Sequence, residues 1–310
     1  MSFSSEVKNE IINSCESGKK LRVCQVLGMI CFGARLVSSP EGLRFRFQSE
    51  NPKISRLLYT VLKNDMKLDV NIRIHKSVKN STYHVVLDNE EHIQKLFRHT
   101  GLIGSAESMT GFLSYKINPR LVKTSNEKKA FLKGAFLAGG SVTTPQKNFH
   151  LEYATAHYRL KGDFEKLLAS LSFSPRTVMR KSNYVVYFKS SEGIADMLTV
   201  LGAYDSVMEY YNIKIIKEMR NSINRKMNCE TANMTKTIDA SMVQVRAIEK
   251  LERLGILENM SEQLREIAHL RLEHRELSLQ ELGSMLSTPI GKSGVNHRLR
   301  KLVEEAEKYK

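Results

Sequence analysis

The feature of this 310-residue sequence that most restricts its fold is an internal duplication. Gly28 is matched by Gly134 and Phe45 by Leu151, and each pair lies 106 positions apart. Three later pairs lie 101 positions apart: Tyr83 with Tyr184, Ile93 with Ile194, and Gly101 with Gly202. A single insertion or deletion of five residues reconciles the two separations. Because the order of the expected helices and strands repeats as well, the sequence predicts two copies of one structural unit.

Each copy is expected to follow the order helix, hairpin, helix, hairpin, helix. In the first copy, about 20–105, the apolar spacing predicts helices at 20–37, 52–66 and 90–99, strands at 43–48, 70–75 and 82–87, and turns around Pro40 and through Lys79, Asn80 and Ser81. In the second copy, about 126–213, it predicts helices at 126–140, 158–171 and 192–201 and strands at 149–154, 176–181 and 183–188. The fold class that follows is α+β, with a duplicated αββαββα domain.

The rest of the chain has only helical patterns. Residues 214–236 are rich in Lys and Arg, which predicts a basic helix or linker. The further helices are expected at 240–254, 261–273, 279–286 and 292–308. The predicted organisation is therefore a duplicated domain at 1–213, a basic linker at 214–236 and an all-α domain at 237–310.

The net charge indicates the class of partner. Lys and Arg number 48 against 33 Asp and Glu, a net charge of +15. Residues 1–213 hold 30 basic and 19 acidic residues, which is +11 of that total. An excess of this size favours nucleic acid over a membrane surface as the partner.

Composition also indicates a location. No stretch approaches the ~20 apolar residues of a membrane span, and the first residues lack the apolar core of a signal peptide. We therefore expect a cytoplasmic, nucleoid-associated protein with no membrane partner. The cysteines are too few and too irregularly spaced for a disulfide framework or a zinc site, so reduced and mostly buried thiols are expected. They are Cys15, Cys24, Cys31 and Cys229.

The stretch 278–308 has the pattern of a helix-turn-helix. Ser278 can cap the first helix, and Pro289 prevents that helix from continuing. The residues of the second helix that are expected to face inward are Val295, Leu299, Leu302 and Val303. The polar residues on its opposite face are Lys292, Ser293, Asn296, His297 and Arg300, with Arg298 and Lys301 displaced around the helix.

This polar face suits a DNA groove. Asn296 can bond adenine through two hydrogen bonds and Arg300 can bond guanine in the same way. Lys292 and Ser293 at the start of the helix can reach phosphates, and the two displaced cations are better placed for the DNA backbone than for base edges. The alternative is an ordinary solvated helix face. Against it, the acidic residues of this helix all lie in its final turns.

Two other sequence patterns do not predict a nucleotide-binding or metal-binding site. The string GKSG at 291–294 would need a glycine at position 286 to form a phosphate-binding loop, and that position is Leu286. His269, His274 and His297 have no metal-ligand spacing with cysteine or carboxylate partners. No cofactor and no metal ion are therefore expected.

The first helix of each copy resembles the LAGLIDADG motif of homing endonucleases. The segment 132–141, LKGAFLAGGS, matches in register at Leu132, Gly134, Ala138 and Gly140, and the segment 26–34, VLGMICFGA, is its weaker partner. In that motif small residues let two helices pack closely, and the last acidic residue of each helix holds a divalent metal over a phosphate. The corresponding positions here are Gly33 and Gly139, which cannot bind metal. The resemblance implies the nuclease fold without its activity.

The whole chain, from MSFSSEVKNEI through INRKMNCETANMTKT to SGVNHRLRKL, resembles the WhiA family of transcription regulators, which act in sporulation and cell division of Gram-positive bacteria. The resemblance implies a degenerate homing-endonuclease domain joined by a linker to a helix-turn-helix similar to region four of sigma factors. It also implies binding of double-stranded DNA without cleavage. An RNA polymerase sigma factor or another transcription regulator is a candidate further partner.

One predicted sheet face of the first copy is basic. Strand alternation places Arg44, Arg46, Gln48, Asn71, Arg73 and His75 on that face, and Leu43, Phe45, Phe47, Ile72 and Ile74 on the other. The matching face of the second copy is weaker, with His150, Glu152, Arg176, Arg180 and Lys181. The residues from which we expect secondary contacts to DNA phosphates are Arg44, Arg46, Arg73, Arg225 and Lys226. A surface for a partner protein is the alternative.

Two rival functions remain at this stage. A residual nuclease would need other carboxylates, such as Glu152, to replace the absent pair. An RNA-binding protein of the maturase type would fit the same fold and charge, but the helix-turn-helix does not favour it.

Overall fold

The computed structural model describes residues 2–309 except 15, 17, 40–41, 78–80 and 103–114. The chain divides into two compact units, Met1–Ile216 and Lys217–Lys310. The turn expected at Pro40 and the connection expected at Lys79 and Asn80 lie outside the described residues.

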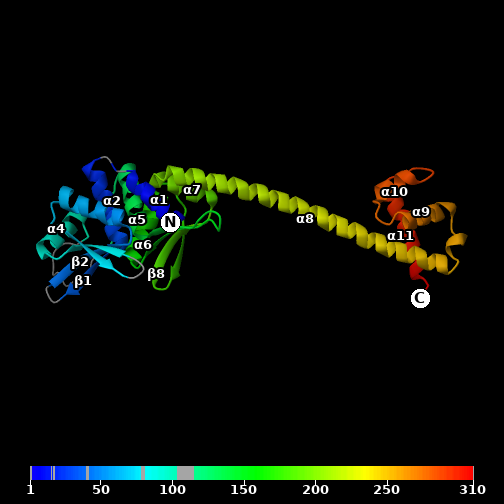
Figure 1. The fold of residues 1–310 in the computed structure, drawn as a ribbon, viewed down its shortest axis with the longest axis horizontal. Helices are drawn as coiled ribbons and strands as arrows, with labels where there is room; N and C mark the ends of the chain where they lie inside the picture. Colours follow the sequence, from blue (N-terminus) through cyan, green and yellow to red (C-terminus); the bar gives the residue numbers. More distant parts are fainter. Residues whose placement is uncertain are drawn as a thin grey trace. The chain divides into compact units, whose positions relative to one another are not determined.

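The first unit contains two copies of one arrangement (Figure 1). The elements up to the end of the first copy are α1 (Phe3–Asn13), α2 (Lys19–Gly33), β1 (Ala34–Ser39), β2 (Gly42–Ser49), α3 (Pro52–Thr60) with a π-helical turn (Val61–Asp65), β3 (Asn71–Lys76), β4 (Ser81–Leu87) and α4 (Glu90–Thr100). Those of the second are α5 (Ser125–Gly139), β5 (Gly140–Val142), β6 (Leu151–Thr155), α6 (Tyr158–Ala169), β7 (Arg176–Arg180), β8 (Asn183–Phe188) and α7 (Ser191–Leu201).

The sheet topology confirms the duplication. Each copy has a four-stranded antiparallel sheet, in the order β1-β2-β4-β3 in the first and β5-β6-β8-β7 in the second. The paired glycines Gly101 and Gly202 follow α4 and α7 and have positive φ angles of 67° and 79°. Glycine ends a helix in this way because it adopts the left-handed conformation without a steric penalty. The expected α+β class with a duplicated domain is confirmed.

Two expected helix boundaries are wrong. The helix expected at 20–37 ends at Gly33, and Ala34–Ser39 is the strand β1, in which Ala34 pairs with Phe47 of β2. The apolar run hid this boundary because the same residues fit either pattern over a short stretch. The break expected between the basic linker and the helix at 240 is also absent, because α8 runs from Tyr204 to Arg253. No glycine or proline interrupts these 50 residues.

The prediction that Ile72 and Ile74 face the interior is wrong. Phe45 and Phe47 of β2 are 1% exposed, whereas the two isoleucines of β3 are 37% and 56% exposed. The strand β3 lies at the edge of its sheet, and all six of its residues are exposed. The alternating pattern therefore predicted the strand itself correctly, but it could not show that no layer covers this face of an edge strand.

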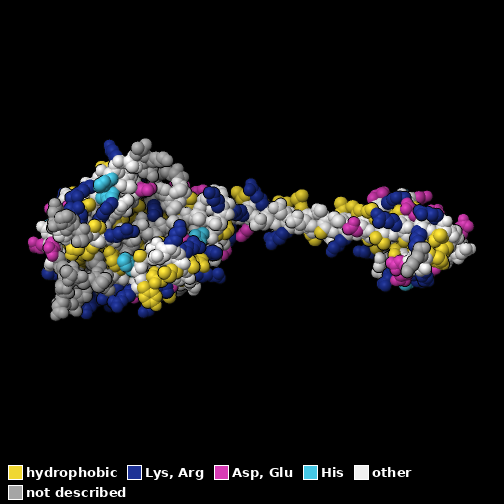
Figure 2. Space-filling view, turned by 90° about the horizontal axis from the view of Figure 1, so that it is seen from below, with side chains coloured by type: hydrophobic (Ala, Val, Ile, Leu, Met, Phe, Trp, Pro, Cys, Tyr) yellow, Lys and Arg dark blue, Asp and Glu magenta, His cyan; other side chains and the backbone are white. Residues whose placement is uncertain are grey.

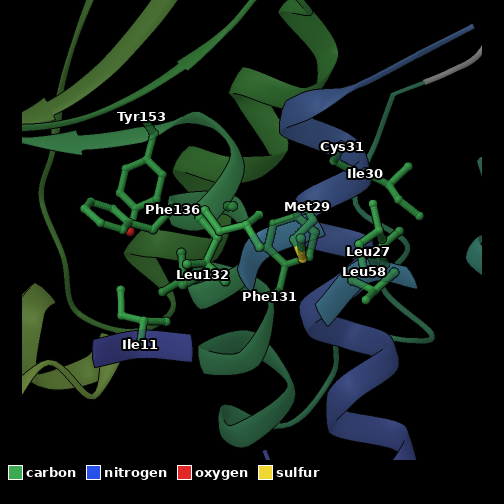
Figure 3. Packing of buried hydrophobic residues seen from close by; sticks show 14 of the residues in the cluster. Ile11, Leu27, Met29, Ile30, Cys31, Leu58, Phe131, Leu132, Phe136 and Tyr153 are labelled. Atoms are coloured by element: carbon green, nitrogen blue, oxygen red, sulfur yellow. The ribbon is translucent and has the colours of Figure 1, made fainter. Parts of the chain in front are cut away.

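The core of the first unit lies around α2 and α5, the two motif helices, which pack against each other (Figure 3). Met29 of α2 and Phe131 of α5 are fully buried in it, and Tyr153 of β6 lies beside Phe136 of α5, with ring centroids 5.7 Å apart. The copies share one core, because buried residues from both belong to a single cluster. Neither copy is therefore expected to be stable alone.

The helix α1, which sequence patterning did not indicate, packs onto this core through Phe3, Val7 and Ile11. The Glu10 carboxylate accepts hydrogen bonds from the backbone nitrogens of Asp205 and Ser206, at 2.6 and 3.1 Å. A carboxylate is stabilising there because the first amides of a helix have no partner within the helix. The N-terminal helix thus caps the start of α8.

The second unit is all helical. After α8 come a short 3₁₀ turn (Leu257–Asn259), α9 (Glu262–Glu273), α10 (Leu279–Met285) and α11 (Lys292–Glu307). Its core joins α8, α9, α10 and α11 through residues that include Ile248, Ile267, Leu282, Val295 and Leu299. The expected helices at 261–273, 279–286 and 292–308 are confirmed to within a residue or two.

A buried arginine organises the loop before α10. The Arg271 side chain is 1% exposed, and its guanidinium donates hydrogen bonds to the carbonyls of His274, Arg275 and Leu277 at 3.3, 3.4 and 2.8 Å. These carbonyls belong to the segment that follows α9, which ends at Glu273. The loop that leads into α10 is thereby fixed to α9.

Candidate nucleic-acid interface

Close approach of α2 and α5 depends on two glycines. A Cβ at Gly28 would overlap the carbonyl oxygen of Phe131 and lie 2.8 Å from the backbone nitrogen of Ala135. Gly134 stands in the same relation to α2, since a Cβ there would lie 3.0 Å from the backbone nitrogen of Met29. The small residues of the motif therefore have the packing role that the sequence implied.

The ends of these two helices hold no acidic group. A Cβ at Gly33 would lie 2.7 Å from the Phe47 ring and 3.0 Å from the Ala138 methyl. At Gly139 it would lie 2.9 Å from the carbonyl oxygen of Ala154 and 3.1 Å from the Phe32 Cβ. The space that a carboxylate would need is thus occupied by apolar groups and backbone. Among the residues that the structure describes, no group of three or more His, Cys, Asp or Glu could hold a metal ion.

The N-terminal ends of the two helices are joined by an ion pair, and a second ion pair links the middle of α5 to the segment before α2. Lys20 Nζ lies 2.5 Å from Glu127 Oε1, and Lys133 Nζ lies 2.7 Å from Glu16 Oε1. The Glu127 carboxylate also accepts hydrogen bonds from the backbone nitrogens of Lys123 and Thr124, both at 2.8 Å. Lys20 and these two amides lower the pKa of Glu127 to about 2. Lys20 and the two amides thus stabilise the charged form of the Glu127 carboxyl.

The outer face of the first sheet presents the expected basic residues, but they are paired. Asp88 accepts a hydrogen bond from Arg44 and lies 2.6 Å from the Arg73 guanidinium. Arg46 donates to His84 Nδ1 at 2.8 Å and to Gln48 at 3.1 Å.

Arginine donation to this ring nitrogen requires neutral His84. Burial and the neighbouring Arg46 charge lower the pKa of His84, which favours that form. The His75 ring lies 4.3 Å from the His84 ring, on the same face. Strand register brings these side chains together on one face, because Arg46 is level with Val86, and Gln48 and Arg73 are both level with His84.

The outer face of the second sheet is organised around Glu152. Its carboxylate lies 2.8 Å from His150 Nε2, 3.9 Å from the Arg180 guanidinium and 3.3 Å from the Ser141 hydroxyl. Arg176 and Lys181 are exposed beside this network. Glu152 thus lies beside His150 and Arg180 on the second sheet, as Asp88 lies beside Arg44 and Arg73 on the first.

In the second unit, α10 and α11 are held by their turn. Ser278 and Glu281 form a capping box at the start of α10, as its sequence predicted for Ser278. A Cβ at Gly283 would overlap the carbonyl oxygen of Ile290 and lie 3.0 Å from Val295 Cγ2. Glu266 of α9 accepts hydrogen bonds from the Ser287 backbone and hydroxyl at 2.6 and 2.5 Å. The close packing at Gly283 and the hydrogen bonds from Ser287 to Glu266 together fix the angle between α10 and α11.

The helix α11 divides into a buried face and a polar face. Val295, Leu299 and Leu302 are fully buried and Val303 is half-buried, as expected. The exposed polar residues are Lys292, Ser293, Asn296, His297, Arg300 and Lys301. Arg298 is half-buried and close enough to Glu266 to lower the pKa of that carboxyl, after the hydrogen bonds from Ser287. Arg298 is thus partly engaged with the turn.

Arg300 is paired with an acidic residue that sequence reasoning set aside. Arg300 Nε lies 2.7 Å from Glu304 Oε1, and the two side chains are 75% and 54% exposed. The spacing of four residues could have revealed this pair. Asp88 was missed for another reason, since its pairing with Arg44 and Arg73 depends on strand register.

The remaining predicted residues lie where they can be reached by solvent. Arg225 and Lys226 are exposed on α8, and Arg225 Nε donates to the Asn221 carbonyl at 3.2 Å. Cys24 and Cys31 are buried, as expected, but Cys229 is exposed and Cys15 lies outside the described residues. In the part of the chain that the structure describes, no helix has both the length and the apolar character needed to cross a membrane.

These features define a class of protein: a LAGLIDADG-like domain whose motif helices lack their acidic residues, followed by a helix-turn-helix domain. Family models match along the chain, as the WhiA N-terminal LAGLIDADG-like domain at 19–103, the WhiA LAGLIDADG-like domain at 128–220 and the WhiA C-terminal HTH domain at 223–306. The chain belongs to the WhiA family.

Individual relatives agree over the full length. A probable cell division protein WhiA of Clostridium perfringens is 40% identical over 313 residues, covering 100% of this chain and 99% of the relative. The protein of the same name from Clostridium tetani is 40% identical over 316 residues, with 99% and 98% covered. The crystal structure of full-length DUF199/WhiA from Thermatoga maritima is similar with a TM-score of 0.58 at 25% identity, covering 100% of this chain and 99% of that one.

Proposed function

We propose that this protein is a non-enzymatic, sequence-specific DNA-binding regulator that controls transcription of sporulation or cell-division genes. The proposal rests on the separation of α11 into a buried apolar face and an exposed polar face. Its buried face is fixed by the domain core, so that Asn296 and Arg300, one helical turn apart, are presented together on the exposed face. The name of the Clostridium relatives supports the link to cell division.

Asn296 and Arg300 are assigned to base edges in the major groove, because Asn suits adenine and Arg suits guanine. Lys292, Ser293 and His297, with Arg298 and Lys301, are assigned to phosphates and to orientation on the duplex. The Arg300–Glu304 pair must separate when Arg300 binds a base.

The first unit is assigned a supporting role. Arg225 and Lys226, on the part of α8 that belongs to the second unit, add phosphate contacts that carry no sequence information. Arg44, Arg46 and Arg73 on the first sheet do the same for the first unit. The surface of this unit is also the candidate site for a sigma factor or another transcription regulator. A nucleoid-associated location in the cytoplasm follows from the DNA-binding role.

The proposal is tested by selection from a randomised duplex pool with the full-length protein at near-physiological salt, where non-specific binding is weak. A short enriched motif that disappears with Asn296→Ala is the expected result. Binding that yields no motif and vanishes as salt rises would contradict sequence-specific recognition.

The enzyme alternative is disfavoured by the surroundings of Glu152, whose oxygens are engaged by His150, Ser141 and Arg180. Plasmid cleavage with Mg²⁺ or Mn²⁺ that a chelator abolishes would be needed to support it. An RNA-binding role would be supported instead if structured RNA displaced bound duplex DNA.

A further inference from the structure

The start of α6 carries an exposed aromatic side chain. Tyr158 is 69% exposed, and its ring meets the Tyr184 ring of β8 edge to face, with centroids 5.7 Å apart. Met179 of β7 is level with Tyr184 and is 64% exposed. Figure 2 shows hydrophobic side chains beside Lys and Arg side chains on the first unit. A tyrosine ring this open to water offers a flat apolar face on which another ring can stack.

Basic residues surround Tyr158. An open hollow of about 560 Å³ lies over α6, and its lining includes Tyr158, Gly162 and four basic residues: Lys116, Arg159, Lys161 and Lys166. The two acidic residues of the lining are both engaged. Asp163 accepts a hydrogen bond from the Ile117 backbone at 3.2 Å. The Glu165 carboxylate lies 2.8 Å from Lys161 Nζ. The hollow therefore has an excess of positive charge, which favours an anionic ligand.

Three of the four basic residues are available to such a ligand. In the described part of the chain, Lys116, Arg159 and Lys166 are exposed and form no ion pair with a carboxylate. The fourth, Lys161, is paired, and its Nζ lies 5.9 Å from the centre of the Tyr158 ring. An open aromatic ring beside unpaired cations is a combination with which proteins bind single strands of nucleic acid. The ring stacks on a base, and the cations contact phosphates.

Gly162 keeps the hollow open. It lies in the middle of α6, where glycine weakens a helix relative to alanine. Close packing does not require it, because a Cβ at Gly162 would meet nothing within 4 Å. It thus differs from Gly28 and Gly134, which α2 and α5 need for their contact. Since Tyr158 and Lys166 lie about one turn away on either side, the missing side chain leaves room for a ligand that reaches from one to the other.

We propose that one surface of the first unit, which we call the α6 surface, binds single-stranded nucleic acid. Its residues are Lys116, Tyr158, Arg159, Gly162 and Lys166. A base stacks on Tyr158, and the three cations contact neighbouring phosphates. The base must be unpaired, because the bases of a duplex are stacked on each other. An acidic peptide fits less well, since its carboxylates would pair with the cations and leave the ring uncovered. The α6 surface lies on the helical side of the second sheet, so it shares no residue with the basic sheet face or with α11.

Fluorescence anisotropy of the full-length protein with labelled oligothymidylate and oligouridylate tests the proposal. Tyr158→Ala is expected to weaken binding by about fivefold or more, through the loss of one stacked base. Gly162→Gln is expected to weaken it as well, although it favours the helix, because the new side chain fills the hollow. Tighter binding of one of the two oligonucleotides identifies DNA or RNA as the ligand. Circular dichroism checks that each variant keeps its fold.

A tryptophan placed at the site reports stacking directly. The chain contains no tryptophan, so Tyr158→Trp introduces a single indole, whose fluorescence a stacked base quenches. Tyr204→Trp is the matched control, because Tyr204 is 63% exposed at the start of α8 and does not line the hollow. Both oligonucleotides are expected to quench the first variant and to leave the second unchanged.

Four outcomes would overturn the proposal. The first is an oligonucleotide affinity that Tyr158→Ala and Gly162→Gln leave unchanged, and the second is equal quenching in the two tryptophan variants. The third is polyglutamate that binds as tightly as the oligonucleotides and loses the same affinity with Tyr158→Ala, which would mean that an acidic peptide is the partner. The fourth is a loss of oligonucleotide binding in Asn296→Ala as large as that in Tyr158→Ala, which would place the strand on α11.

Discussion

Gly134 lies against the backbone of Gln25 so closely that a Cβ at position 134 would overlap the Gln25 carbonyl oxygen. Relief would require the two motif helices to separate, because the obstruction is backbone and not the end of a flexible side chain. Gly134→Ala is therefore expected to destabilise the first unit by about 3 kcal/mol or more, at the upper end for overpacked cores. Urea unfolding followed by circular dichroism measures the change.

Gly162 is the matched control for this substitution. It also lies in a helix, α6, and a Cβ there would meet nothing within 4 Å. Gly162→Ala is expected to stabilise the protein by about 0.5–1 kcal/mol, because alanine loses less backbone entropy in a helix. If both variants changed stability in the same direction, close helix approach would not be the reason for Gly134.

The ion pair at the other end of the motif helices predicts a pH dependence. The pKa of Glu127 is lowered to about 2 from an ordinary value of 4.5, chiefly by Lys20 and two backbone amides. Because the folded-state pKa is lowered, the stabilisation is complete above pH 4.5 and is lost as pH falls from 4.5 towards 2.

The midpoint of thermal unfolding, measured from pH 7 to pH 2.5, checks this expectation. Glu127→Gln should lower the midpoint at pH 7 and flatten its dependence below pH 4.5. Parallel curves for the wild type and the variant would show that other carboxylates cause the acid sensitivity.

Base recognition predicts sequence-dependent losses on the preferred DNA site. Asn296→Ala or Arg300→Ala is expected to weaken binding there by about 1–3 kcal/mol and to relax specificity at the base that each side chain contacts. Fluorescence anisotropy with the preferred and a scrambled duplex measures both. Equal losses on the two duplexes would refute base recognition.

Glu304 provides the companion variant. Glu304→Gln removes the partner of Arg300 and one negative charge from the polar side of α11. We expect it to tighten binding to both duplexes, and to have less effect once Arg300 is alanine, because the two side chains interact. Additive effects would mean that the pair does not restrain Arg300.

The basic sheet face predicts a change in salt dependence. Arg44→Glu with Arg46→Glu should lower DNA affinity and make the dependence of log K on log salt shallower, since fewer counterions are released. Asp88→Asn, which frees Arg44 and Arg73 from their shared carboxylate, should make that slope steeper. If neither variant moved affinity or slope, the sheet would have no contact with DNA.

Introducing acidic residues at the two motif positions is not expected to create a nuclease. At Gly33 a new side chain meets Phe47 and Ala138, and at Gly139 it meets the Ala154 backbone. Gly33→Asp with Gly139→Asp is expected to destabilise the protein and to leave plasmid DNA intact with Mg²⁺ or Mn²⁺. Chelator-sensitive cleavage by this variant would show that the space can open.

Sequence reasoning succeeded where a pattern is local and repeated. Matching glycines located the duplication, and Ser278 with Pro289 located the helices of the second unit, because caps and helix breakers act over a few residues. It failed where the outcome depends on distant parts of the chain. Whether Ile74 is covered depends on the layer above an edge strand, and no residue near it in sequence carries that information.

The candidate site shows the same difference between local patterns, which were predicted, and contacts between distant parts of the chain, which were not. Alternation placed Arg46 and Arg73 on one face, and helical spacing placed Asn296 and Arg300 together. The partners of these residues were not predicted, because Asp88 reaches Arg44 and Arg73 only through strand register. Site residues could be read from a pattern, but their electrostatic state required the fold.

The filled space at the ends of the motif helices ties any change at Gly33 or Gly139 to a change in the residues around it. A carboxylate at Gly139 is of no use until the backbone at Ala154 has moved, and that movement brings no benefit without the carboxylate. Each missing acid thus needs at least two coupled changes, with a less stable intermediate between them. Single substitutions at these two positions are therefore not expected to build a metal site, and the helix pair serves packing.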